Sequence, residues 1–274
     1  MSISGNGTMK FLLETPKYRT RACDYKGKFK FRRPLVKLTL EELKEKPLRY
    51  RNNKKVFSIP TCKPLNLPHQ DLPVPPFIFG FWYWNRLRPN VFVLKDINFK
   101  EICEKLKSSG YKIVNLKKRW DGAHLFGVSP TIESQLLPFI PTQIPSNYIL
   151  ASQEQRIELL SGIINGRIRQ YHKKGDFFKI SSANWAEIRK LQGLVESVGC
   201  RTSLYSQEYN KYYALSFRIR YLLCALQEVR PIKVHQTRRY VSEIEEIGTH
   251  QCVHIETDGP DGTFLAGEGY ISCL

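Results

Sequence analysis

The segment "RIELLSGIINGRIRQ", residues 156–170, changes its hydrophobic period part-way along. Up to Ile164 the apolar residues recur at the spacing of one helix face. Gly162 lies inside this helix, where glycine is about 1 kcal/mol less favourable than alanine unless a neighbour packs close. After Gly166 the period becomes two, as in a strand. The segment therefore predicts a closely packed helix that leads into a strand whose one face carries Arg167, Arg169 and Tyr171.

A similar order of elements occurs earlier in the chain. "PFIFGFWYWNR" predicts an apolar helix with Gly80 at the place that Gly162 holds later. In both copies the pattern predicts helix, strand, strand, helix, strand, strand, and the second helices end at Gly110 and Gly199. Two helices cross closely only where the contacting residues are small, so the two glycines predict a helix pair at the centre of a pseudo-twofold unit. The alternative is a generic α+β domain in which both glycines are incidental.

The chain divides by composition into three parts, which we expect to form an α+β fold. Residues 1–58 and 238–274 predict a β-rich unit, with a short helix capped by Thr39 and Glu42. Residues 59–75 are proline-rich and extended, as a linker or wrapping arm would be. Residues 76–237 hold the repeat, with αββαββ halves at about 76–145 and 146–237.

The net charge of +18 on 274 residues favours a polyanionic partner, above all nucleic acid. The alternative is that the basic residues only keep the surface soluble. We favour a polyanionic partner because the positive net charge is large. No lysine or arginine follows Arg239, whereas seven acidic residues do. This acidic C-terminal segment is a candidate surface for a protein partner.

Seven cysteines without CxxC spacing, and a start without a signal peptide, predict free thiols in a reducing, cytoplasmic compartment. No apolar run approaches the ~20 residues of a membrane span, so we expect no membrane partner. The cysteines are scattered and the six histidines do not pair with them, so we expect no zinc site and no cofactor.

Three stretches carry a resemblance to a known family. They are "LPVPPFIFGFWYWNR", "IPSNYILASQEQRIELLSGIINGR" and "HQCVHIETDGPDGTFLAGEGYIS", in this order. The first two resemble the stretches that contain the two motifs of LAGLIDADG homing endonucleases, and the third is similar to the C-terminal splicing blocks of inteins. The resemblance implies a LAGLIDADG-like repeat inside an intein, with the chain ends forming a remnant of the splicing (Hint) domain.

The sequence departs from this family at the residues that carry its chemistry. The resemblance places Asn85 and Arg167 where the family has its metal-binding acids, and an amide or an arginine is a poor ligand for a hard cation. Tyr18 stands where the family has the histidine that assists splicing, and the chain ends "ISCL" without the asparagine that cyclises. We therefore expect no catalytic residue, no bound metal and no enzymatic activity.

The candidate nucleic-acid contacts come from basic and aromatic residues on the predicted strands and turns. Trp120 has two readings of equal weight, as a base-stacking platform or as a cap on the core. The set is Arg86, Arg88, Lys117, Lys118, Arg119, Trp120, Arg167, Arg169, Tyr171, His172, Lys173, Lys174, Arg218 and Arg220.

Together these patterns predict a non-catalytic nucleic-acid-binding protein on a degenerate intein and homing-endonuclease scaffold, from a phage or microbial gene. RNA is slightly favoured over DNA, because an aromatic-rich basic surface suits unpaired bases. One alternative is a DNA endonuclease with ligands outside the family motifs. Another is an adaptor that binds a protein.

Overall fold

The computed structural model divides the chain into two compact units. The smaller combines both ends, Met1–Cys62 with His235–Leu274, and the larger is the continuous segment Lys63–Val234. The structure describes residues 10–14, 18–23, 29–32, 35–50, 52–60, 64–85, 91–94, 99–136, 143–166, 178–207, 212–217, 238–246, 264–266 and 271–273.

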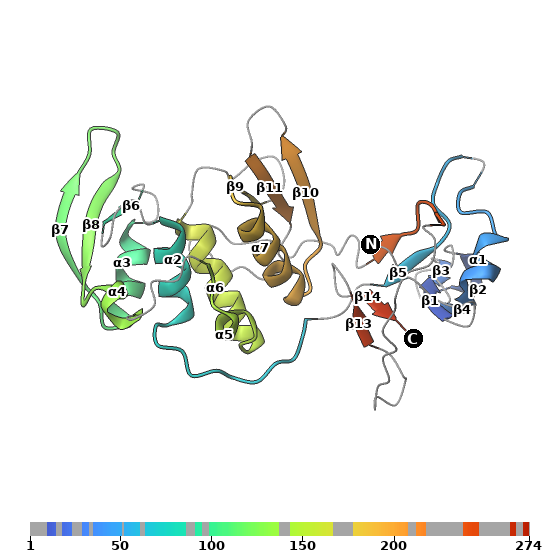
Figure 1. The fold of residues 1–274 in the computed structure, drawn as a ribbon, viewed down its shortest axis with the longest axis horizontal. Coiled ribbons are helices and arrows are strands. Elements are labelled where there is room, and N and C mark those ends of the chain that lie inside the picture. The colour runs from blue at the N-terminus through green and yellow to red at the C-terminus, as the bar shows by residue number, and fades with distance from the viewer. Residues whose placement is uncertain are drawn as a thin grey trace. The chain divides into compact units, whose positions relative to one another are not determined.

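Two helices lie side by side at the centre of the larger unit, α2 (Pro76–Asn85) and α6 (Gln153–Gly166) (Figure 1). They touch backbone to backbone at their glycines. A Cβ atom added at Gly80 would lie 2.2 Å from the carbonyl oxygen of Leu159, and one at Gly162 would lie 2.1 Å from that of Phe77. The predicted close crossing is confirmed, and no larger residue fits either position without moving a backbone.

Among the described residues, each half of the larger unit adds a three-stranded antiparallel sheet and a helix. The αββαββ pattern predicts a fourth strand in each half, and in the second half that strand, "RIRQYH", lies outside the described residues. In the first half the strand order is β6-β8-β7, and in the second it is β9-β11-β10, so the repeat holds strand by strand. The elements of the first half are β6 (Phe92–Leu94), α3 (Phe99–Ser108), β7 (Lys112–Lys118) and β8 (His124–Ser129). Those of the second are β9 (Phe178–Ser182), α7 (Trp185–Ser197), β10 (Thr202–Gln207) and β11 (Tyr212–Phe217).

The helix ends follow from local signals in the sequence. The α7 helix begins after Asn184, whose side chain accepts a hydrogen bond from the backbone N–H of Glu187 at 3.3 Å. Gly110 and Gly199 follow α3 and α7 with φ of +88° and +80°, a conformation that favours glycine. The predicted ends of both helices are confirmed.

One continuous core joins the two halves. It consists of the apolar sides of α2, α3, α6, α7 and both sheets, and it includes three of the four consecutive aromatic residues of α2, Phe81, Trp82 and Tyr83. Two short helices, α4 (Ile132–Leu136) and α5 (Ser146–Ile149), complete the unit. Among the described residues, no helix combines the length and the apolar character that crossing a bilayer requires.

The proline-rich stretch runs extended along the larger unit and is held at three points. Arg156 donates to the carbonyl of Leu65, the Gln155 side chain bonds both backbone groups of Gln70, and the Tyr148 hydroxyl donates to the carbonyl of Val74 at 2.8 Å. Burial raises the pKa of Tyr148 well above its usual range, so this hydroxyl keeps its proton.

The smaller unit is built mainly from strands. In the part of this unit that the structure describes, the largest sheet has the order β12-β5-β1-β4, and the one helix is the short α1 (Leu40–Lys44). Thr39 and Glu42 form the predicted capping box, with hydrogen bonds of 2.8 and 3.1 Å. The strands are β1 (Lys10–Glu14), β2 (Tyr18–Cys23), β3 (Phe29–Arg32), β4 (Leu35–Thr39), β5 (Ser58–Pro60), β12 (Arg238–Tyr240), β13 (Phe264–Ala266) and β14 (Ile271–Cys273).

Candidate nucleic-acid interface

The first sheet turns one face to α3 and the core and the other to solvent. Phe92, Phe126 and Val128 lie on the core face. On β7 the residues opposite Ser129 and Leu125 of β8 are Lys112 and Lys117, and Ser129 and Leu125 share a face because they are four residues apart. Both lysines are exposed, so they lie together on the solvent side.

A β-bulge makes this possible. Lys112 and Lys117 are five residues apart, a spacing that would put them on opposite faces of a regular strand. The register shifts between Val114 and Lys117, and Asn115 within the shift has a φ of +54°. The extra residue turns Lys117 back onto the face of Lys112. The bulge therefore brings two of the three lysines of β7, Lys112 and Lys117, to one side of the strand.

The second sheet likewise has one face against the core and one face toward solvent. Ile180, Leu215 and Phe217 face the core beside α7. On the other face Tyr205 pairs with Ala214 and Tyr212 with Gln207, so the two tyrosines lie on one side of the sheet. They are 54% and 51% exposed, so this face offers two aromatic rings to solvent, with Lys179 of β9 on the same face.

The turn between β7 and β8 carries the most exposed aromatic side chain described. Trp120 is 94% exposed, so the reading of Trp120 as a cap on the core is wrong. The turn is closed by a hydrogen bond from the N–H of Arg119 to the carbonyl of Ala123 at 2.7 Å. Lys117 and Lys118 directly precede it and are exposed.

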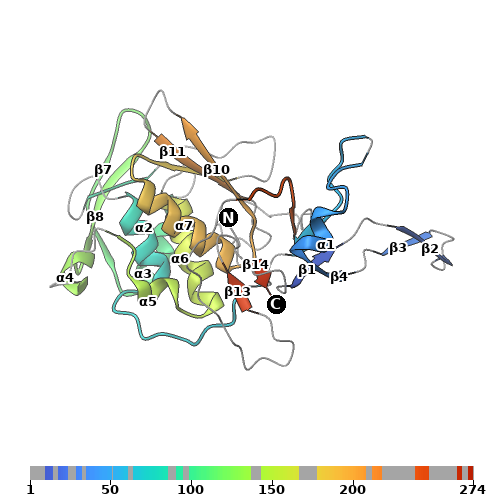
Figure 2. The same cartoon turned by 45° about the vertical axis from the view of Figure 1, so that its right-hand side comes forward.

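The two hairpins, β7–β8 and β10–β11, extend to the same side of the larger unit in both views (Figures 1 and 2). The α2 and α6 helices begin on the opposite side, near α5 and the proline-rich stretch, and end toward the hairpins (Figure 1). The solvent-facing lysines and tyrosines thus belong to two sheets that flank the same pair of helix ends.

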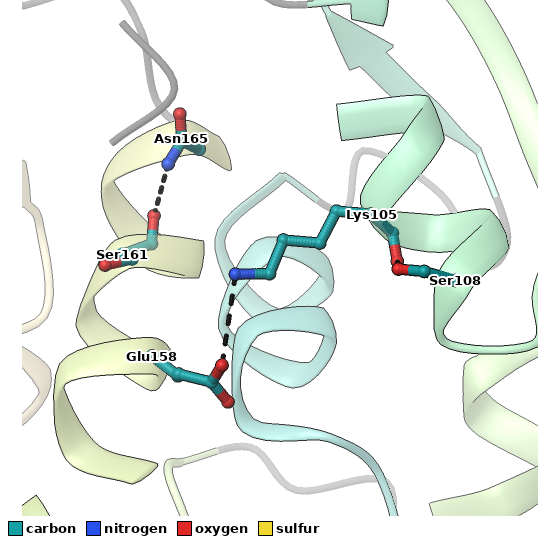
Figure 3. A network of polar contacts seen from close by, with 5 residues as sticks. All are labelled: Lys105, Ser108, Glu158, Ser161 and Asn165. Carbon is teal, nitrogen blue, oxygen red and sulfur yellow. Dashed lines mark hydrogen bonds and ion pairs between the residues drawn. The ribbon is translucent and has the colours of Figure 1, made fainter. Parts of the chain in front are cut away.

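The polar groups between α3 and α6 neutralise each other (Figure 3). The ammonium of Lys105 lies 4.0 Å from the carboxylate of Glu158 and 4.0 Å from the centre of the Phe77 ring. Near the end of α6, the Asn165 side chain donates to the carbonyl of Ser161 at 2.8 Å. Among the residues that the structure describes, no group of three or more His, Cys, Asp or Glu side chains is placed to hold a metal ion.

Cys103, on the buried side of α3, is a poor nucleophile. Burial raises the pKa of its thiol, and Glu104 raises it further, whereas Lys107 lowers it by a smaller amount than burial raises it. Because the thiolate is the reactive form, this cysteine serves as a small core residue.

Comparison by sequence and comparison by structure give different results for this chain. No family model matches it. No curated protein matches it. Several solved structures are similar to it, however. Mesophilic variants of the homing endonuclease I-DmoI are similar at 14% identity and a TM-score of 0.37, over 54% of this chain and 89% of that chain.

Two further structures are similar to a comparable degree. I-DmoI in complex with DNA and Mn gives 13% identity and a TM-score of 0.38, over 53% of this chain and 89% of that chain. The N-terminal LAGLIDADG domain of WhiA gives 11% identity and a TM-score of 0.37, over 56% of this chain and 80% of that chain. With TM-scores this low, these likenesses do not assign a chemistry to this chain.

The expectation that the chain is not an enzyme is contradicted at this point, because the similar structures include homing endonucleases. It depended on the residue types at positions 18, 85 and 167 and on the ending "ISCL". Arg167 lies outside the described residues, and so does the side chain of Asn85, although the α2 helix ends at this residue. Residues that differ from the family at these places do not show that the chain is inactive.

The structure describes four of the fourteen predicted contact residues, Lys117, Lys118, Arg119 and Trp120, and brings them together at one hairpin. The others lie outside the described residues: Arg86, Arg88, Arg167, Arg169, Tyr171, His172, Lys173, Lys174, Arg218 and Arg220. The Tyr18 side chain is likewise outside, although β2 begins at this residue.

Sequence reasoning missed Tyr205 and Tyr212 on the solvent face of the second sheet. The signal was the alternation in "TSLYSQ", where Ser203, Tyr205 and Gln207 share one side of a strand and Leu204 lies on the other. It missed Lys112 because only the bulge brings this residue to the face of Lys117.

Proposed function

We propose that the chain binds nucleic acid through the solvent-facing sides of its two three-stranded sheets and the hairpins that extend from them. The observation that carries the proposal is the matched pair of sheets, whose exposed faces bear Lys112 and Lys117 in one half and Tyr205 and Tyr212 in the other. A ligand that spans both halves would contact lysines through phosphates and tyrosines through sugars or bases.

The charge of the whole chain supports a polyanion as the ligand. The net charge is +18, and the segment after Arg239 is acidic, so the positive excess belongs to the residues before it. Lysines on a sheet face attract phosphates without reading sequence, and such contacts set affinity and its dependence on salt. An adaptor that binds a protein would not require this excess.

We favour RNA slightly over DNA, and the support is the exposed aromatic side chains. Trp120, Tyr205 and Tyr212 are each more than half exposed. Aromatic rings stack on unpaired bases, which are common in folded RNA and absent from an intact duplex. The cysteine pattern supports a reducing compartment such as the cytoplasm as the place of action. The smaller unit, formed from both chain ends, is where the intein-like resemblance predicts a splicing-domain remnant.

The test is a set of anisotropy titrations with duplex DNA, single-stranded DNA and single-stranded RNA at several salt concentrations. We expect log affinity to fall linearly with log salt, by about 0.9 per neutralised phosphate for duplex and about 0.7 for single strands. The same samples, incubated with Mg²⁺ or Mn²⁺ and with chelator, show whether the ligand is cut. Affinity that is absent for all three ligands, or that does not change with salt, would overturn the proposal.

A pair of matched variants locates the binding face. Lys112→Ser with Lys117→Ser removes two charges from the solvent face of the first sheet. Lys100→Ser with Lys107→Ser removes two charges from α3, which covers the opposite face of that sheet. We expect the first variant to lower the salt slope by about 1.4 to 1.8, the amount for two phosphates, and the second to leave it unchanged. An equal decrease in salt slope for both variants would show that the solvent face of the first sheet is not the binding face.

A further inference from the structure

The β7–β8 turn is built to hold one tryptophan out from the protein. The N–H of Arg119 donates to the carbonyl of Ala123 at 2.7 Å, and the N–H of Gly122 donates back to the carbonyl of Arg119 at 3.1 Å. Gly122 has a φ of +78°, which a glycine adopts without strain. Trp120 lies between these bonds and is 94% exposed.

Asp121 braces the turn from its other side. One of its carboxylate oxygens accepts a hydrogen bond from the N–H of Ala123 at 3.2 Å, and the other lies 3.3 Å from the guanidinium of Arg119. These contacts fix the backbone on both sides of Trp120. The turn is therefore already ordered in the free protein. Binding then costs little conformational entropy at this turn, which favours affinity.

The charges around Trp120 select its partner. Lys117, Lys118 and Arg119 immediately precede it, and both lysines are exposed. Cations beside an exposed indole attract phosphates, while the indole offers a flat apolar face. A base inside a duplex is covered on both faces by its neighbours and presents only its edges, whereas an unpaired or terminal base has a free face.

We propose that Trp120 stacks on an unpaired nucleobase, in a bulge, loop or single-stranded stretch of the nucleic acid that the neighbouring lysines bind. This rests on the proposed function and goes beyond it, because it names the structural class of ligand. In the second half the segment between β10 and β11, residues 208–211, reads "EYNK" and has a tyrosine and no tryptophan.

The test compares two RNA hairpins that differ by one bulged nucleotide in an otherwise identical stem. Trp120→Ala should lower affinity for the bulged hairpin about tenfold, the usual effect of removing one stacking side chain. Affinity for the fully paired hairpin should change by less than about twofold, because its bases offer no free face. Trp120→Phe should recover most of the affinity, since phenylalanine also stacks. A 2-aminopurine in the bulge should decrease in fluorescence on binding the wild type and stay bright with Trp120→Ala.

Two controls separate the possible failures. Lys117→Ser with Lys118→Ser should weaken binding to both hairpins alike, because phosphates are present in both. An equal decrease in affinity for both hairpins with Trp120→Ala, or no decrease for either, would overturn the stacking proposal and leave the proposed function intact. A wild-type protein that binds neither hairpin would contradict both the stacking proposal and the proposed function. Affinity for the paired hairpin also reports folding, which an exposed side chain should not affect.

Discussion

At the scale of single residues, Arg156 connects three segments of the larger unit. It is fully buried, and its guanidinium donates to the carbonyls of Ala151, Ser197 and Leu65, the first two at 2.9 and 2.8 Å. These acceptors belong to the turn before α6, the end of α7 and the proline-rich stretch. A planar group with five donors can bond three separate carbonyls at once, so one residue ties three segments together.

We predict that Arg156→Ala lowers the free energy of unfolding of the larger unit by about 3 kcal/mol or more, because it removes three hydrogen bonds and leaves the carbonyl of Ala151 without this donor, whereas the carbonyl of Ser197 keeps the N–H of Leu65. Arg156→Lys should lower it nearly as much, since an ammonium lacks the fork that reaches all three acceptors. The measurement is chemical denaturation of the full chain. The control is Arg119→Ala, whose exposed ion pair with Asp121 should contribute less than about 1 kcal/mol. Similar changes for both arginines would contradict the structural role given to Arg156.

At the scale of elements, the crossing of α2 and α6 decides the architecture. The two helices approach until only hydrogen atoms on Gly80 and Gly162 separate them, as the Cβ distances of 2.2 and 2.1 Å to the facing carbonyl oxygens indicate. Van der Waals contact between backbones stabilises the pair only at this separation. Any side chain at either glycine forces the helices apart along their length.

We predict that Gly80→Ala and Gly162→Ala each destabilise the larger unit by about 1–3 kcal/mol or more, although alanine is intrinsically the better helix former. The double variant should be destabilised by less than the sum of the two, because the first substitution already separates the helices at the shared crossing. Ser108→Ala, on the exposed side of α3, is the control and should change stability by less than about 0.5 kcal/mol. Unfolding midpoints measure all four variants. Strict additivity would contradict a single shared crossing.

The elements also show what the sequence could and could not predict. Both central helices, their glycine contact and the ends of α3 and α7 followed from periodicity, capping residues and glycines, which are local signals. The burial of Arg156 could not be predicted, because its partners Ser197 and Leu65 are 41 and 91 residues away. The bulge at Asn115 was equally invisible, since a non-glycine residue with positive φ leaves no reliable pattern in a sequence.

At the scale of the whole molecule, the positive net charge and the internal repeat together indicate which ligand the two sheets bind. The repeat gives two sheets with the same strand order, and the charge of +18 makes a polyanion the natural ligand for their solvent faces. The two halves differ in what they present. The first offers lysines and Trp120, and the second offers tyrosines. A ligand spanning both would therefore be held differently at its two ends.

The alternation of "GRIRQYH" predicts a basic strand in the second half. It predicts that Arg167 and Arg169 share one face and that Lys173 and Lys174 follow at the next turn, a stretch outside the described residues. We predict that replacing all four by serine lowers the salt slope by about 0.7 to 0.9 for each phosphate that the variant no longer neutralises. Affinity should fall about equally for all sequences, because phosphate contacts position a nucleic acid without reading its bases.

The matched control removes the same charge from the smaller unit, by serine at the four exposed lysines Lys37, Lys44, Lys46 and Lys54. Equal melting temperatures of both variants and the wild type would show that neither fold has changed. If the first variant keeps the wild-type slope, the binding face lies elsewhere. If the control shows the smaller slope instead, the basic strands of the smaller unit bind the phosphates, with "KGKFKFRRPLVK" the first segment to replace. The slope of log affinity against log salt decides among these outcomes, because it counts released counterions and does not depend on the sequence of the ligand.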